Sequence, residues 1–355
     1  MSGPPSSPVD YDLAVATARR LAPAPPQISW AEATAVVTEL RGLAVRAEEH
    51  VRQVTGLVPP LEPEEAVVVD RPGWAEVNVR SFRTVLEPLT EKLREKQQSK
   101  VATAVTAKVA GVQMGTILAW LSGKVLGQYE ALLPEGTDGR LVVVAPNIVE
   151  TERRLGVDPQ DFRLWVTLHE VTHRTQFTAV PWLHDHVRTE VGTLLEATKL
   201  DDPQALLDRL KGIVTELPRG GSLIDVLQTP EQKVVLDRVT AFMSLLEGHA
   251  EHVMDGVGPS VVPSVRHIRD RFQQRRRETG GLLDKVLRRV LGLDLKALQY
   301  AEGKAFVDHC VQAVGMASFN KVWDSPQTLP TREEIRRPQQ WVERVHGSGP
   351  AEITA

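Results

Sequence analysis

The sequence predicts a mainly α protein with a small β element, and three observations support this class. Apolar residues recur every three or four positions through most of the chain, which is the period of helices buried on one face. Proline or a capping residue precedes several of these segments, as is usual at helix starts. One β-branched run, Arg140-Leu-Val-Val-Val-Ala145, reads convincingly as a strand.

The first half of the chain predicts three long helices and a strand pair. Ser29 and Glu32 stand three apart and resemble a capping box, so a helix should begin here and run towards Val54. Further helices are expected over residues 74–98 and 101–129. A lone strand is not stable, so residues 140–145 should pair with another short strand, for which residues 66–70 are the candidate.

The second half is expected to be helical after the strand ends at Pro146. Asp158 or Asp161 could cap a helix that carries Leu164, Trp165, Leu168 and His169 on inward faces. Later helices are expected over residues 181–199, 203–212, 230–255, 263–276 and 293–314. Residues 275–281 form a basic, glycine-closed connector that should be a solvated loop.

Length and composition predict one folded catalytic domain. The chain has 355 residues, of which 42% are hydrophobic and 25% charged, as in ordinary globular proteins. We expect a single domain over residues 10–345, with an N-terminal helical part (10–135) and a metal-site part (136–345). Residues 1–9 are expected to be disordered and residues 346–355 to form a flexible tail.

The net charge, the cysteine content and the lack of a secretory signal exclude several classes of protein. The net charge of −4 argues against a dedicated nucleic-acid binder. The single Cys310 excludes an intramolecular disulfide and a cysteine-rich metal cluster. The N-terminus lacks the pattern of a secretory signal, so a cytoplasmic protein is expected. Residues 109–123, with glycines at 111 and 115, are too short and too polar to span a membrane and predict a buried helix.

His169-Glu-Val-Thr-His173 is the motif that carries chemistry. Residues four apart lie on one side of a helix, so the two imidazoles can share a zinc ion. Glu170 then stands beside the open face of the metal, where a carboxylate can take a proton from the activated water. The motif therefore predicts a zinc-dependent hydrolase, although two histidines that merely pack or cap remain the alternative.

A third ligand is expected, and Glu247 is the candidate. Gln176 and Ala179 stand where a metzincin has Gly and His, so that extension is absent. Glu247 and Glu251 lie four apart on one face of an apolar helix, which suggests a ligand and a second carboxylate that hydrogen-bonds a ligand histidine; a solvated acidic stripe is the alternative. Gly248 between them indicates either close approach of another backbone or room for substrate.

Four other histidines compete for the ligand role. His249 and His252 lie about 200° and 140° around the helix from Glu247, which makes a shared metal difficult. His184 and His186 follow the motif helix closely and are the more serious rivals.

Residues 161–177, together with 247–251 and 121–129, resemble an actinobacterial family of zincin-like metallopeptidases or hydrolases, some labelled as associated with deazaflavin coenzyme biosynthesis. The likeness covers roughly residues 10–345. It implies a gluzincin-type fold with zinc (Zn2+) on His169, His173 and Glu247, and with Glu170 as general base. The step from His173 to Glu247 is longer than in the best-known glutamate zincins.

Catalysis also needs a donor to the oxyanion, and Tyr300 is the candidate among three tyrosines. An extended substrate could bind along residues 141–145 or near Asn147.

The leading hypothesis is a zinc peptidase that cleaves a peptide or small amide, with no nucleic-acid or membrane partner. The alternative is a catalytically inactive zincin scaffold that binds or regulates, linked to deazaflavin coenzyme metabolism. Substrate identity and oligomeric state are not readable from the sequence.

Overall fold

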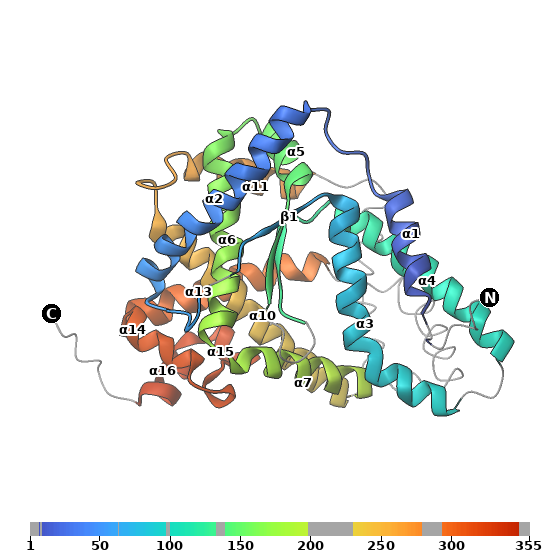
Figure 1. Cartoon of the computed structure of the whole chain (residues 1–355). Coiled ribbons are helices and arrows are strands. Elements are labelled where there is room, and N and C mark those ends of the chain that lie inside the picture. The colour runs from blue at the N-terminus through green and yellow to red at the C-terminus, as the bar shows by residue number, and fades with distance from the viewer. Residues whose placement is uncertain are drawn as a thin grey trace. The chain divides into compact units, whose positions relative to one another are not determined.

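The computed structural model describes residues 7, 9–62, 64–96, 100–132, 139–197, 230–278 and 293–347 (Figure 1). Their contacts form two units. Unit 1 takes its residues from Met1–His184 and Val257–Gln273, and unit 2 from Asp185–Gly256 and Gln274–Ala355. The expected helix over residues 203–212, most of the N-terminal segment and the tail, and residues 279–281 of the basic connector lie outside the described residues. The loop expected from residue 275 was wrong over residues 275–278, which belong to a helix that ends at Glu278.

Unit 1 holds a small sheet with helices around it. Its elements in chain order are α1 (Tyr11–Leu21), α2 (Trp30–Thr55), β1 (Val67–Val69), α3 (Arg71–Lys96), α4 (Lys100–Ser122), β2 (Gly127–Glu130), β3 (Arg140–Val144), α5 (Ala145–Leu155), α6 (Pro159–Ala179) and the first part of α11 (Val265–Glu278). The predicted mainly α class with a small β element is therefore confirmed.

Among the described residues the sheet has three strands in the order β1-β3-β2. β1 runs parallel to β3 with Val68 opposite Val143, so the predicted pairing of these two segments is confirmed. β2 runs antiparallel to β3 on its other side, with Gly127 opposite Val143. The helix predicted over residues 101–129 was therefore wrong at its end: it stops at Ser122, and the last four residues before Ala131 form a strand.

Two further expectations, that a substrate binds along residues 141–145 or near Asn147, are not met. β3 is hydrogen-bonded on both sides, so residues 141–145 offer no free edge to a substrate. Asn147 is buried in α5, where its amide nitrogen donates to the carbonyls of Ser122 and Val125, each at 2.6 Å, and its oxygen accepts from Arg71 Nε at 2.7 Å. This side chain fastens α5 to the turn before β2 and is not available to a ligand.

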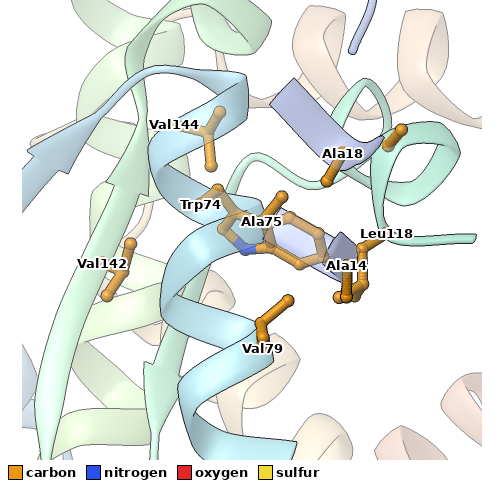
Figure 2. Close-up of a cluster of buried hydrophobic side chains, with 9 residues drawn as sticks. Ala14, Ala18, Trp74, Ala75, Val79, Leu118, Val142 and Val144 are labelled. Carbon is orange, nitrogen blue, oxygen red and sulfur yellow. The ribbon is translucent and has the colours of Figure 1, made fainter. Parts of the chain in front are cut away.

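The core beside the sheet is built on Trp74 of α3 (Figure 2). Its indole lies among small side chains of α1, Leu118 of α4 and the valines of β3. Gly111 and Gly115 explain the close packing of α1 on α4, because a Cβ at either position would lie 2.4 Å from a backbone oxygen of Asp10 or Ala14. The glycine pair thus serves a helix crossing inside the protein.

The other face of α4 is exposed at Val109, Val112 and Ile117, so this helix is half-buried where a buried one was predicted. Within the described part of the chain, none of the helices combines the length and the apolar character needed to cross a membrane.

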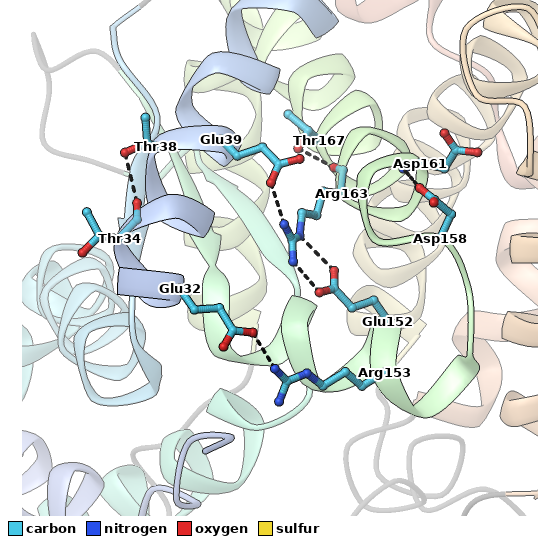
Figure 3. A network of polar contacts seen from close by, with 10 residues as sticks. All are labelled: Glu32, Thr34, Thr38, Glu39, Glu152, Arg153, Asp158, Asp161, Arg163 and Thr167. Atoms are coloured by element: carbon cyan, nitrogen blue, oxygen red, sulfur yellow. Dashed lines mark hydrogen bonds and ion pairs between the residues drawn. The ribbon is translucent and has the colours of Figure 1, made fainter. Parts of the chain in front are cut away.

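α6, which carries the motif, contacts α2, β2 and β3. Figure 3 shows how Arg163 fixes its first turns: the guanidinium reaches Glu39 of α2 at 2.5 Å and Glu152 of α5 at 2.5 and 3.0 Å. All three side chains are largely buried, and the bidentate pairing with Glu152 gives the contact a defined geometry. The motif helix is thus tied to two neighbours before it reaches the histidines.

Unit 2 consists of helices and the short segments that join them, among its described residues. It contains most of α7 (Trp182–Ala197), then α10 (Pro230–Val257), α13 (Leu293–Val314), α14 (Met316–Phe319), η2 (Asn320–Trp323), η3 (Pro326–Thr328), α15 (Arg332–Arg336) and α16 (Pro338–His346). α10 and α13 cross with almost no space between them, since a Cβ on Gly248 would lie 2.2 Å from the carbonyl carbon of Gly303. Of the two interpretations of Gly248, close backbone approach is the one observed.

Candidate metal centre

The motif lies in the middle of α6, whose start is fixed by a side-chain cap. Asp158 is the N-cap residue, and its carboxylate accepts from the backbone N–H of Asp161 at 3.0 Å. Asp161 has a different task, because its carboxylate accepts from the backbone N–H of Ser264 at 2.7 Å. The sequence did not distinguish Asp158 from Asp161 as the N-cap residue, and in the structure the N-cap residue is Asp158.

The two motif histidines face each other with the geometry of a shared ligand pair. Their Nε2 atoms are 3.2 Å apart, and the ring planes are perpendicular with centroids 4.7 Å apart. Two nitrogen ligands at the usual zinc–nitrogen distance lie roughly 3.3 Å apart in a tetrahedral site. The separation of the two Nε2 atoms therefore matches that of two ligands of one tetrahedral metal ion.

His173 makes a second contact on its far side. Its Nδ1 lies 3.0 Å from Oε1 of Gln176, one turn further along α6. Gln176 is fully buried, at 0% exposure. Gln176 was noted from the sequence only because it stands where a metzincin has glycine. Its contact with His173 was not predicted.

Glu170 is buried against the edge of the sheet. Its exposed fraction is 7%, and a Cβ built on Gly127 of β2 would lie 2.8 Å from its carboxyl carbon and 3.1 Å from Oε1. Only a residue without a side chain lets the carboxylate lie so near the strand. β2 is an edge strand of the described sheet, so the motif carboxylate lies against the face of an edge strand. This contact was not predicted, because residues 127–129 were expected to be helical.

Tyr129, two residues after Gly127, points to the same side of β2. Its ring stacks on Phe177 of α6 with centroids 5.4 Å apart, and its hydroxyl lies 3.3 Å from Nε2 of His184. Phe177 follows His173 by one helical turn. An aromatic cluster of Tyr129, Phe177 and His184 therefore continues the histidine face of α6.

His186, the other rival from this segment, packs its ring against Phe242, and burial lowers the pKa of this imidazole. His184 is engaged by the aromatic cluster. Neither histidine is brought into the motif pair by these contacts.

In unit 2, Glu247 and Glu251 lie one turn apart on α10, on both sides of the crossing with α13 at Gly248. His249 is fully buried, with its ring 5.3 Å from that of Trp323 and 6.1 Å from that of Phe319. His252 bonds to Asp308 of α13 at 2.7 Å through Nδ1. Both histidines thus take part in the packing of unit 2.

Tyr300 falls within α13, but its side chain lies outside the described residues, so the expectation of an oxyanion donor there stays a prediction.

Comparison with known proteins agrees with the motif. The family model described as zincin-like metallopeptidase matches residues 9–342. A crystal structure from Chloroflexus aurantiacus, described as "a putative hydrolase with a novel fold", is 33% identical, with a TM-score of 0.70 over 96% of this chain and 100% of the other. No curated protein matches the sequence. The chain belongs to the zincin-like metallopeptidase family.

Proposed function

We propose that this protein is a zinc-dependent peptidase or amidase, with His169, His173 and Glu247 as the metal ligands. The observation that carries the proposal is the 3.2 Å separation of the two Nε2 atoms, which matches a shared metal. Glu247 is proposed as the third ligand because its carboxylate would complete a catalytic set of two histidines and a glutamate. Membership of a zincin-like family supports a metal ion, usually zinc, and the similar structure described as "a putative hydrolase" supports hydrolytic chemistry.

Glu170 is the general base of this proposal. When bound, zinc lowers the pKa of a water molecule and polarises the carbonyl to be attacked. Glu170 accepts the proton of the attacking water and returns it to the leaving amine. Its burial against Gly127 holds the carboxylate at one place, which is what proton transfer to a positioned group requires.

The edge strand β2 supports a peptide as substrate. An extended chain can add to a sheet edge through backbone hydrogen bonds, and the edge strand β2 is the strand whose Gly127 contacts Glu170. We propose that a substrate binds along β2, which replaces the earlier expectation for residues 141–145. Glu251, one turn after Glu247, is proposed to orient a ligand histidine from behind. A cytoplasmic location remains part of the proposal.

The substitution Glu170→Gln tests the base and separates an enzyme from an inactive scaffold. Wild type, Glu170→Gln and the exposed control Glu49→Gln are loaded with zinc, assayed for metal content, and incubated with a mixed peptide library whose cleavage is followed by mass spectrometry. Glu170→Gln should keep its metal and lose about 10²-fold or more of the cleavage rate, while Glu49→Gln should behave as wild type.

Equal cleavage by wild type and Glu170→Gln would contradict the role of Glu170. Full metal loading of the wild type without cleavage of any peptide or amide would favour the alternative of a metal-binding scaffold without turnover.

A further inference from the structure

We infer that Gln176 is a positioning residue that sets His173 for metal binding, an inference that rests on the proposed metal site. Glutamine side chains are mostly exposed in proteins, yet Gln176 is fully buried and its Oε1 lies 3.0 Å from Nδ1 of His173. A buried amide oxygen needs a donor, and the imidazole is placed to supply it.

The contact determines which ring nitrogen of His173 carries the proton. A neutral imidazole has one N–H and one lone pair, and Oε1 can only accept. Nδ1 therefore carries the hydrogen and donates it to Gln176, which leaves the lone pair on Nε2. Nε2 is the atom that lies 3.2 Å from Nε2 of His169. Gln176 thus directs the Nε2 lone pair of His173 towards the side on which a metal would be shared with His169.

The same contact fixes the orientation of the ring. Gln176 and His173 are three residues apart on α6, so one helix holds both donor and acceptor. Partners behind metal-bound histidines fix ring orientation and raise ligand basicity, and their loss typically costs 10–100-fold in metal affinity. An uncharged amide here does so without adding a negative charge to the buried face of α6.

The first test needs no metal. Nitrogen-15 NMR of the imidazole in metal-free protein distinguishes the two tautomers of His173, with His173→Ala used for assignment. Wild type should carry the proton on Nδ1, and Gln176→Leu should shift the population towards Nε2–H. The matched control Thr175→Val removes a buried hydroxyl whose hydrogen bond, among the described residues, goes to the helix backbone at Val171, so it should leave the tautomer unchanged.

The second test measures zinc affinity by competition with a chelator in the same variants. Gln176→Leu should bind zinc 10–100-fold more weakly than wild type, and Gln176→Glu at least as tightly as wild type, because a carboxylate is the stronger acceptor. Thr175→Val should match wild type. Circular dichroism checks each fold, and Gln176→Met, which keeps the chain length, carries the same test if the leucine variant does not fold.

The outcomes separate the two proposals. Nε2–H in the wild type, or equal zinc affinity in wild type and Gln176→Leu, would overturn the role of Gln176 while leaving the metal site standing. A wild type that binds no zinc would overturn the metal site and the role of Gln176 together.

Discussion

Replacing Gly248 by alanine should destabilise unit 2, although alanine is the better helix former. The new Cβ would lie 2.2 Å from the carbonyl carbon of Gly303, 2.3 Å from its oxygen and 2.6 Å from the backbone nitrogen of Lys304. Carbon atoms in contact prefer roughly 3.5–4.0 Å, so the two helices must separate by about 1 Å or more. Because these are backbone atoms, no side-chain rotation can relieve the overlap.

The expected magnitude follows from two opposing effects. Overpacking typically costs about 1–3 kcal/mol, and an overlap with three backbone atoms belongs to the upper part of that range, about 2–3 kcal/mol. Alanine returns about 1 kcal/mol in helix propensity. The free energy of unfolding should therefore fall by about 1–2 kcal/mol, and Glu247, the neighbouring residue on α10, should bind metal less tightly.

Urea unfolding followed by circular dichroism measures the change, with Gly42→Ala on α2 as the matched control. A Cβ at Gly42 would meet nothing within 4 Å, so this variant should gain up to about 1 kcal/mol. Opposite signs for the same substitution at the two sites are the prediction. If Gly248→Ala proves as stable as wild type or more so, the close crossing of α10 and α13 is refuted.

Three further predictions follow. Gly127→Ala puts a Cβ 2.7 Å from Cγ of Glu170, so the carboxylate must swing away; peptide cleavage should fall about 10²-fold with little change in unfolding midpoint, and unchanged cleavage would contradict the proposed base. Burial raises the pKa of Cys310 to about 12, so iodoacetamide at pH 8 should label this thiol only after unfolding; rapid labelling of folded protein would refute its burial. Burial opposes ionisation of Glu334, but hydrogen bonds, chiefly from Arg344, outweigh it and hold the pKa of Glu334 below its ordinary value of 4.5. Its contribution to stability is therefore present above pH 4.5 and lost as the pH falls through the lowered pKa, so Glu334→Gln should flatten the acid side of the unfolding profile; an unchanged profile would contradict this.

Local signals in the sequence predicted much of the fold. Ser29 caps α2 through the backbone N–H of Glu32, as expected, although the Glu32 carboxylate bonds to Arg153 instead of closing the capping box. The β-branched runs of β1 and β3 pair as predicted. β2 was missed because Gly-Gln-Tyr-Glu has little strand propensity and is held by pairing with β3. α5 was missed because Pro146 reads as a strand stop, whereas it occupies the first turn of a helix.

The candidate metal centre also has a part that was predictable from the sequence and a part that was not. The histidine pair was predictable because a four-residue step on one helix fixes its geometry locally. The approach of Gly127 to Glu170 was not, because it depends on a strand and a helix that are distant in sequence. The contact of Gln176 with His173 was predictable only in part. Their three-residue spacing on α6 is local, but the burial of Gln176 depends on how α6 packs.

Metal stoichiometry tests the central claim most directly. Elemental analysis of purified wild type, His169→Ala and Glu247→Ala, each supplied with zinc and checked for folding by circular dichroism, shows whether one ion depends on both residues. The proposal predicts about one zinc per chain in the wild type and loss of that zinc in both folded variants. A wild type without zinc, or a Glu247→Ala variant that keeps it at full strength, would contradict the assigned ligand set.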